Sequence, residues 1–193
     1  MDGEDVQRQE TQVAVDERDL IACSCAGDLD AFDSLVRAHQ GRIYNLAYRL
    51  TGNREDATDA AQEAFVRAYQ ALPRFRQAAA FSTWLYRITT NAALDLVRRR
   101  PAIPPVELTA DHPARDDPEA EAQRREIHRR VHAALGHLPP EYRAAVVLRD
   151  LQGLEYVEVA RILQVPIGTV RSRLSRGREA LRAQLTDLVA AEG

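Results

Sequence analysis

A proline-rich, acidic stretch divides the chain into two parts. Residues 101–121 contain five prolines, and one arginine stands there against six carboxylates, which leaves a net charge of −5. Proline fixes φ and removes a backbone donor, so the stretch predicts an extended, partly stiff linker. A chain of 193 residues cut at this point is expected to form two small domains, at residues 18–100 and 122–187.

Both domains are predicted to be all-α. In the first, apolar residues recur at three- and four-residue steps through 28–50, 54–72 and 83–100, and no run shows sustained strand alternation. Thr51-Gly52-Asn53 marks the first break, and Ser82 is the expected N-cap of the third helix. The second domain is expected to contain four helices joined by short turns, over 121–138, 141–152, 155–164 and 167–185.

Charge follows the same division. Residues 18–100 hold twelve arginines against nine acids, and residues 122–193 hold twelve against eight, so both are basic although the whole chain carries −3. Residues 1–17 carry one arginine against six acids and lack apolar periodicity, which predicts a disordered acidic tail. Residues 188–193 are predicted to form a second, short tail. All 26 basic residues are arginine, which we attribute mainly to a GC-rich genome.

No apolar run approaches the length that spans a membrane, and the acidic N-terminus lacks the features of a signal peptide. The sequence therefore predicts a cytoplasmic protein without membrane insertion. Cys23 and Cys25 are interpreted as small buried thiols in a helix. The alternative is a metal site completed by distant histidines such as His128 and His132, which lie one helical turn apart.

Residues 156–175, YVEVARILQVPIGTVRSRLS, have the spacing of a helix-turn-helix. Ala160 falls where the two helices cross, Val165 lies in the turn, and Val170 packs the second helix on the first. Gln164 stands where many such motifs have glycine. At 100° per residue, the second helix gathers a thin apolar stripe of Ile167, Val170, Leu174, Gly177 and Leu181. The pattern predicts a second helix that enters the major groove of DNA.

The opposite side of that helix carries small polar residues and arginines, whose donors and acceptors suit phosphates and base edges. The residues expected to contact DNA are Thr169, Arg171, Ser172, Arg173, Ser175, Arg176 and Arg178. Among these, Arg173 and Arg178 are expected to bind phosphates or to support the residues that read DNA. The alternative is a terminal helix whose arginines are simply solvated.

Longer segments of both domains resemble one family. A resemblance to conserved region two of bacterial RNA polymerase sigma factors is carried by TGNREDATDAAQEAFVRAYQALPRF and FSTWLYRITTNAALDLVRRR. A resemblance to region four is carried by LPPEYRAAVVLRDLQGLEYVEVARILQVPIGTVRSRLSRGREAL. Because the linker is short and holds no further domain, the chain is similar to the extracytoplasmic-function (ECF) group over residues 18–185. The resemblance implies an alternative sigma factor that binds core RNA polymerase and directs promoter-specific initiation.

The resemblance assigns Asp59, Gln62 and Glu63 to contact with the clamp helices of the polymerase's largest subunit. These residues are i, i+3 and i+4 neighbours on one helix. Carboxylates and an amide suit an arginine-rich partner, because charge-assisted hydrogen bonds are strong. Without the resemblance, the same residues would indicate an ordinary solvated acidic face.

The resemblance also implies capture of the melted non-template strand at the minus-ten element. A flipped base needs stacking or apolar walls and polar groups directed at its edges. Phe75 and Ile88 can equally be core residues, whereas Asn91 is more telling, because an amide inside an apolar helix needs a partner. The residues expected at this site are Arg67, Ala71, Phe75, Arg76, Gln77, Ile88, Asn91, Arg98 and Arg99.

Two departures from the family pattern stand out. Relatives usually have polar or acidic residues where this chain has Gln77-Ala78-Ala79-Ala80, and that loop helps to choose the minus-ten base. Glu155 replaces the small hydroxyl residue common at the start of the first helix of the helix-turn-helix, although an acid is electrostatically acceptable in a first turn.

Three function classes follow. The first is a sigma factor that needs no cofactor, is not an enzyme, reads the minus-thirty-five duplex with the second domain and is controlled by an anti-sigma factor. The second is a stand-alone helix-turn-helix regulator whose first domain senses a signal or dimerises. The third is an enzyme or metalloprotein that uses Cys23, Cys25 and the histidines.

Overall fold

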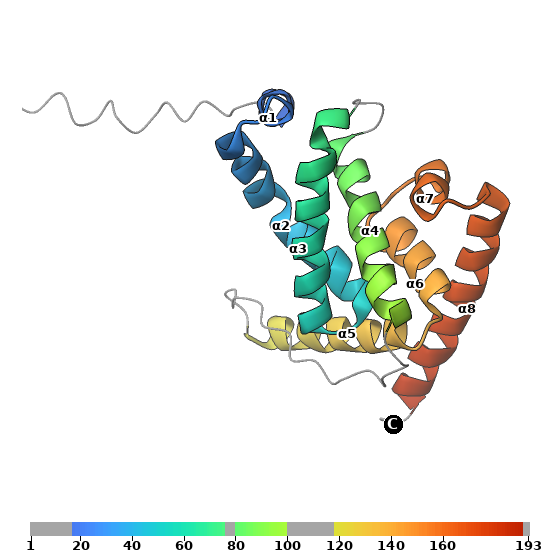
Figure 1. Ribbon diagram of the computed structural model, residues 1–193. Coiled ribbons are helices and arrows are strands. Elements are labelled where there is room, and N and C mark those ends of the chain that lie inside the picture. Colours follow the sequence, from blue (N-terminus) through green and yellow to red (C-terminus); the bar gives the residue numbers. More distant parts are fainter. Residues whose placement is uncertain (1–16, 76–79, 100–117, 191–193) are drawn as a thin grey trace, which may run out of the picture.

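The computed structural model describes residues 17–75, 80–99 and 118–190, and every regular element within these ranges is helical. The predicted all-α fold of two helical groups is confirmed (Figure 1). Most of the predicted tail at 1–17 and linker at 101–121 lies outside the described residues. Helical structure reaches into both of these segments, at Glu17 and at 118–121, and into the predicted second tail, at 188–190.

The first domain consists of four helices and one short 3-10 turn. They are α1 (Glu17–Cys25), α2 (Leu29–Thr51), α3 (Arg54–Ala71), η1 (Leu72–Arg74) and α4 (Phe81–Arg99). Helices α2, α3 and α4 pack on one another, and α1 covers the first part of α2.

The predicted break at 51–53 is a pair of helix caps. Gly52 has φ 87°, a left-handed conformation that costs glycine little, and its N–H bonds to the carbonyl of Tyr48. The side chain of Asn53 then accepts from the N–H of Asp56 at 2.8 Å and starts α3. One residue ends the first helix and the next begins the second.

Alanine lets the three long helices approach closely. The inner side of α3 is almost wholly alanine, while leucine and isoleucine from α2, η1 and α4 fill the space around it. Small side chains permit short distances between helix axes, and the larger ones interdigitate beside them. The residues involved are Ala57, Ala60, Ala61, Ala64 and Ala68 of α3, with Leu35, Ile43, Leu46, Leu50, Leu72 and Leu85 around them.

Two local predictions in this domain are wrong. Helix α4 begins at Phe81, so Ser82 lies inside its first turn and is not the N-cap. Phe81, the first residue of the helix, is buried. Cys23 is exposed rather than buried, because the buried side of α1 consists of Ile21 and Ser24.

The second domain has the four predicted helices. They are α5 (Pro118–Gly136), α6 (Pro140–Val146), α7 (Tyr156–Leu163) and α8 (Ile167–Ala190), and a π-helical turn, η2 (Val147–Leu151), prolongs α6. Helix α6 is buried between its neighbours and packs mainly along α8.

Helix α8 lies so close to α6 that a side chain has no room at Gly177. A Cβ built there would stand 2.8 Å from Cγ2 of Val146 and 3.4 Å from the carbonyl oxygen of Tyr142. Val146 is itself buried and β-branched, so it has little freedom to move away. This contact sets the distance between the two helices.

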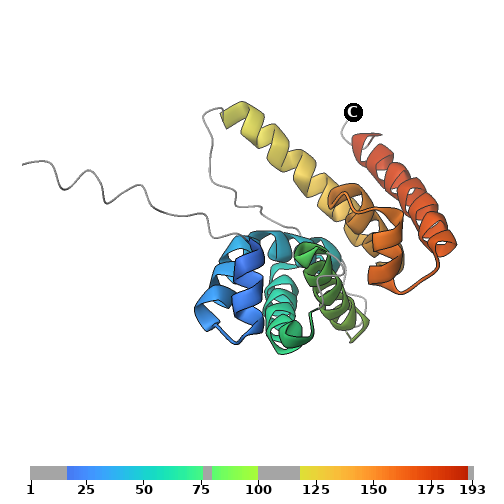
Figure 2. The ribbon, with the colours of Figure 1, turned by 90° about the horizontal axis from the view of Figure 1, so that it is seen from above.

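The two domains lie side by side (Figure 2). Helix α5 crosses the end of α2, and α7 rests on α4. The ring of His132 lies against that of Tyr48, with centroids 4.2 Å apart, and its Nε2 is 3.2 Å from the Tyr48 carbonyl oxygen. Burial lowers the pKa of His132 below its ordinary 6.5; the bond to the Tyr48 carbonyl opposes this shift, and the nearby cations Arg143 and Arg49 reinforce it.

We expect Gly177→Ala to destabilise the protein by about 1–3 kcal/mol, the usual cost of overpacking a core. The measurement is the free energy of unfolding in urea. The control is Gly41→Ala in α2, where a Cβ meets nothing within 4 Å, and the gain in helix propensity should stabilise by up to about 1 kcal/mol. Equal free energies for the two variants would contradict the close approach of α8 and α6.

We expect the protein to lose stability on acidification. The lowered pKa of His132 means that the unfolded chain binds its proton more readily, so stability is complete above about pH 6.5 and falls as the pH drops below that value. His132→Gln should reduce the change in the urea unfolding midpoint between pH 5 and pH 7.5. The exposed His137 supplies the control, since His137→Gln should keep the wild-type dependence. Identical slopes for both variants would contradict this origin.

Candidate nucleic-acid interface

The helix-turn-helix is formed by α7, a short turn and the first half of α8. Gln164 ends α7 with φ 55° and ψ 44°, the conformation for which many such motifs use glycine, and it is the one non-glycine residue with positive φ in the described chain. The N–H of Val165 bonds back to the carbonyl of Ala160 at 3.1 Å. Pro166 then accepts from the N–H groups of Thr169 and Val170 and opens α8.

The apolar stripe of α8 is confirmed with one exception. Val170, Leu174 and Gly177 are buried and Leu181 is half-buried, but Ile167 is 38% exposed because it lies at the open end of the helix. The start of α7 shows how the departure at Glu155 is accommodated. Glu158 accepts from the N–H of Glu155 at 2.9 Å, and the Glu155 carboxylate pairs with Arg149 at 3.2 Å.

The residues predicted to contact DNA lie on the outer side of α8. Arg171, Ser172, Ser175 and Arg176 are exposed, whereas Thr169 and Arg173 are half-buried. Within the described ranges, Arg171 and Arg173 form no ion pair. The Ser172 hydroxyl donates to the Thr169 carbonyl at 2.9 Å, so its oxygen remains as an acceptor.

Two other arginines of α8 are bound to its neighbours. Arg178 makes a bidentate pair with Asp150 of η2 at 2.6 and 2.9 Å, which raises its pKa. Nη1 of Arg176 donates to the hydroxyl of Tyr142 at 3.2 Å, which also raises the pKa of that guanidinium. Arg178 therefore anchors α8, while Arg176 is held by one bond and keeps its other donors. Sequence reasoning missed Asp150 and Tyr142, because both reach α8 from another helix.

In the first domain, α4 presents a continuous stripe of predicted residues. Ile88, Asn91 and Arg98 follow one another at helical spacing, and Asp95 completes the series. Asn91 is exposed, so the expectation of an amide inside the protein is wrong: it lies on the outer side of α4 and needs no buried partner. Arg98 and Arg99 are exposed at the end of the helix.

Helices α3 and α4 are joined by Arg67. Its Nε lies 2.7 Å from Glu63, and its Nη1 lies 3.6 Å from Asp95, which is 3.8 Å from Arg98. The hydrogen bond to Glu63 is the main reason that the pKa of Arg67 is raised. Asp95 was missed, although its spacing of four residues from Asn91 could have revealed it.

An aromatic cluster lies at the start of α4. Phe75, Phe81 and Trp84 have ring centroids 4.9 to 5.8 Å apart, and His39 meets the edge of Phe81 at 5.3 Å. Phe75 and Ile88 are half-buried, so each combines packing with an accessible edge. Ala71 is half-buried at the end of α3. Arg76 and Gln77 lie outside the described residues.

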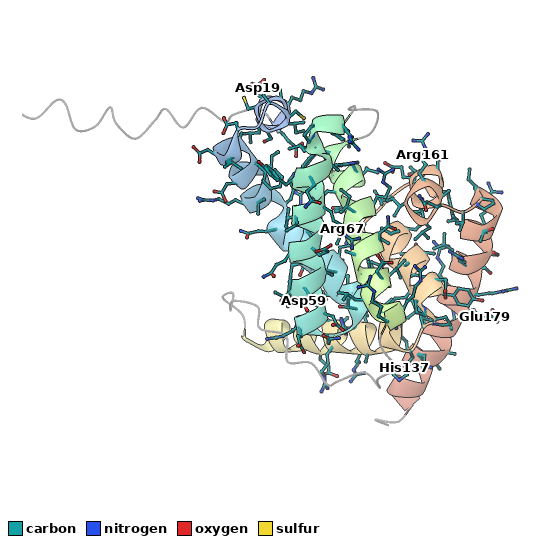
Figure 3. The ribbon with its side chains drawn as sticks, viewed as in Figure 1. Asp19, Asp59, Arg67, His137, Arg161 and Glu179 are labelled. Atoms are coloured by element: carbon teal, nitrogen blue, oxygen red, sulfur yellow. The ribbon has the colours of Figure 1, made fainter. Side chains whose placement is uncertain are left out.

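The residues predicted to bind core polymerase lie together on α3. Asp59, Gln62 and Glu63 are all exposed, and Figure 3 shows Asp59 toward the end of α3 nearest α5, with Arg67 further along. Val66, 52% exposed, continues the same side of the helix and adds an exposed apolar side chain that the charge pattern did not indicate.

The proposed metal ligands do not meet. Cys25 donates its thiol to the Leu72 carbonyl at 3.3 Å, and Cys23 faces outward. The described residues contain no group of three or more His, Cys, Asp or Glu that could hold a metal ion. No helix in that part of the chain combines the length and apolar character that crossing a bilayer requires.

Comparison with known families gives matches in both domains. The model of Sigma-70 region 2 matches residues 35–102, and that of Sigma-70 region 4 matches residues 128–181. Solved structures similar to the chain include CnrH in complex with the cytosolic domain of CnrY (29% identity, TM-score 0.64, 92% of this chain and 99% of that one). Another is the sigma factor RpoE with the anti-sigma factor NepR from Bartonella quintana (24%, TM-score 0.66, 82% and 98%), a likeness of fold.

Curated relatives agree with these matches. ECF RNA polymerase sigma factor SigE of Mycolicibacterium smegmatis is 47% identical over 161 residues, which cover 81% of this chain and 62% of SigE. RNA polymerase sigma-H factor of Pseudomonas aeruginosa is 42% identical, over 84% of this chain and 90% of that protein. SigW of Bacillus subtilis is 39% identical, over 84% and 92%. With both regions matched in order along one all-helical chain, the protein belongs to the ECF family of RNA polymerase sigma factors.

Proposed function

We propose that the chain is an alternative sigma factor that binds core RNA polymerase and starts transcription at a specific set of promoters. The observation that carries the proposal is the pairing of two exposed surfaces on one chain: the acidic side of α3 and the arginine- and serine-rich side of α8. A stand-alone regulator would need only the second. The chain works in the cytoplasm, where polymerase and promoter are, as a specificity subunit rather than an enzyme.

Helix α8 reads the minus-thirty-five element in the major groove. Arg171, Ser172, Ser175 and Arg176 contribute donors and acceptors toward base edges, and Arg173 and Thr169 bind phosphates near the start of the helix. Arg178 supports this surface through its pair with Asp150 and does not contact DNA, since its Nε and Nη2 both donate to that carboxylate.

The first domain holds the melted minus-ten strand. Ile88 and the aromatic residue Phe75 offer apolar walls for an unstacked base, while Asn91 offers an amide to its edge. Arg98 and Arg99 attract the phosphates that follow, and Arg67, Arg76 and Gln77 complete the site. Arg67 is linked to Glu63, so the strand-binding side and the polymerase-binding side of α3 share one ion pair.

The remaining partner is an anti-sigma factor. CnrH and RpoE, which share this fold, were solved with the cytosolic domain of CnrY and with the anti-sigma factor NepR. By the same likeness, such a partner binds this chain and covers the polymerase-binding side, the DNA-reading sides, or both.

The test of polymerase binding is a charge reversal at Asp59. Asp59→Arg should weaken binding to core polymerase at least about tenfold, or about 1.4 kcal/mol, and remove promoter-specific initiation in a purified transcription assay. The matched control is Asp19→Arg, another exposed aspartate early in a helix, in α1 (Figure 3). If the wild-type chain neither binds core nor starts transcripts, the stand-alone regulator takes the place of this proposal.

The test of DNA reading compares two arginines of α8. Arg171→Ala should weaken binding to a minus-thirty-five duplex and lower the slope of log affinity against log salt by about one, because one phosphate or base contact is lost. Arg178→Ala should leave the slope near the wild-type value and lower thermal stability instead. Fluorescence anisotropy over a salt series measures both, and equal slopes for the two variants would contradict the division of roles.

A further inference from the structure

A buried arginine joins the two domains. Arg143 of α6 is 7% exposed, and its guanidinium meets carbonyl oxygens instead of a carboxylate. Nη1 donates to Leu50 in the first domain at 2.8 Å, and Nη2 donates to Gly136 and Leu138 in the second at 2.7 and 3.1 Å. Burial lowers its pKa, but an arginine remains charged.

The carbonyls that Arg143 binds belong to helix ends. Leu50 lies in the last turn of α2, which ends at Thr51, and Gly136 is the last residue of α5. The last carbonyls of a helix lack intrahelical partners and form the negative end of its dipole. One guanidinium therefore neutralises the ends of two helices that come from different domains, and it can do so only while the domains touch.

Two further contacts cross the same boundary. His132 of α5 stacks on Tyr48 of α2, as described above, and the hydroxyl of Thr83 in α4 donates to Glu158 of α7 at 3.1 Å. Arg143 lies more deeply buried than either pair, and it is the residue that bonds to the backbone on both sides.

With the two domains side by side, the chain is too compact to reach both promoter elements at once. This step rests on the function proposed above. Elements centred at minus ten and minus thirty-five are separated by about 25 base pairs, or about 85 Å at about 3.4 Å per base pair. A compact chain of this length has a radius of gyration of about 16 Å and a diameter of about 42 Å. The two domains must separate before both elements are bound.

We infer that Arg143 is a latch that holds the free chain in this closed arrangement and weakens its assembly with core polymerase. Binding to core draws the domains apart, and Leu50 must give up the guanidinium for water. The apparent affinity for core is then reduced by the fraction of chains that are closed. Arg143 touches neither DNA nor polymerase and acts only through the position of the domains.

The experiment uses the full chain and two matched variants. Arg143→Met keeps the apolar stem and removes all three bonds. Arg149→Met is the control. Arg149 is a half-buried arginine that, like Arg143, donates to a backbone carbonyl, that of Leu154 at 2.7 Å, but this bond lies within the second domain. Solution X-ray scattering measures the radius of gyration, fluorescence anisotropy measures affinity for core polymerase, and circular dichroism confirms helical content.

Arg143→Met should have a larger radius of gyration than wild type and should bind core about tenfold more tightly, equivalent to about 1.4 kcal/mol. Arg149→Met should change neither quantity. The latch is refuted if both variants match wild type in size and in core affinity.

A second variant covers the case in which Arg143→Met loses helical content. Tyr48→Ala with Thr83→Val removes the ring contact with His132 and the hydrogen bond to Glu158 from the first-domain side, and it leaves every bond within the second domain in place. It should also enlarge the free chain and tighten core binding; if it does neither, the latch is overturned. Failure of the wild-type chain to bind core would instead remove the proposed function, and the scattering comparison would still decide the latch.

Discussion

The buried guanidinium of Arg143 is the interaction on which the arrangement of this molecule depends. A charge at that depth is tolerable because three carbonyl oxygens accept from it, and those carbonyls lie at or just beyond helix ends, where no backbone donor is left for them. It draws together the end of α2, the end of α5 and the turn that starts α6. The position of α5 beneath the first domain, and with it that of α6 to α8, follows from this point.

Within each domain, small residues decide how close the helices come. The alanines of α3 allow α2 and α4 to pack tightly around it, and Gly177 allows α8 to approach α6 to a distance that no side chain would permit. Close packing on one side leaves the other side of α3 and α8 clear. The acidic stripe of α3 and the arginines of α8 are therefore presented on rigid helices, which holds their spacing more precisely than loops could.

The charged residues of these surfaces divide into two kinds. Arg178 is committed to a carboxylate of the chain itself, whereas Arg171 and Arg173 form no ion pair among the described residues. An arginine in a bidentate pair must give up that pair before it can bind phosphate, so the same residue type has different roles on one helix. Because every basic residue of the chain is arginine, composition alone could not distinguish the paired arginines from the unpaired ones.

Local patterns in the sequence determined the all-α class, the break at 51–53, the four helices of the second domain and the helix-turn-helix, because periodicity and caps act within a few residues. The same patterns placed Ser82 and Asn91 wrongly, since burial of Phe81 and the outward side of α4 depend on neighbouring helices. The pairing of Arg178 with Asp150, the close approach at Gly177 and the bond from Arg143 to Leu50 were decided only by the tertiary structure. Each joins residues from different helices, 93 positions apart in the last case, and no spacing along the chain specifies which distant backbone a side chain will meet.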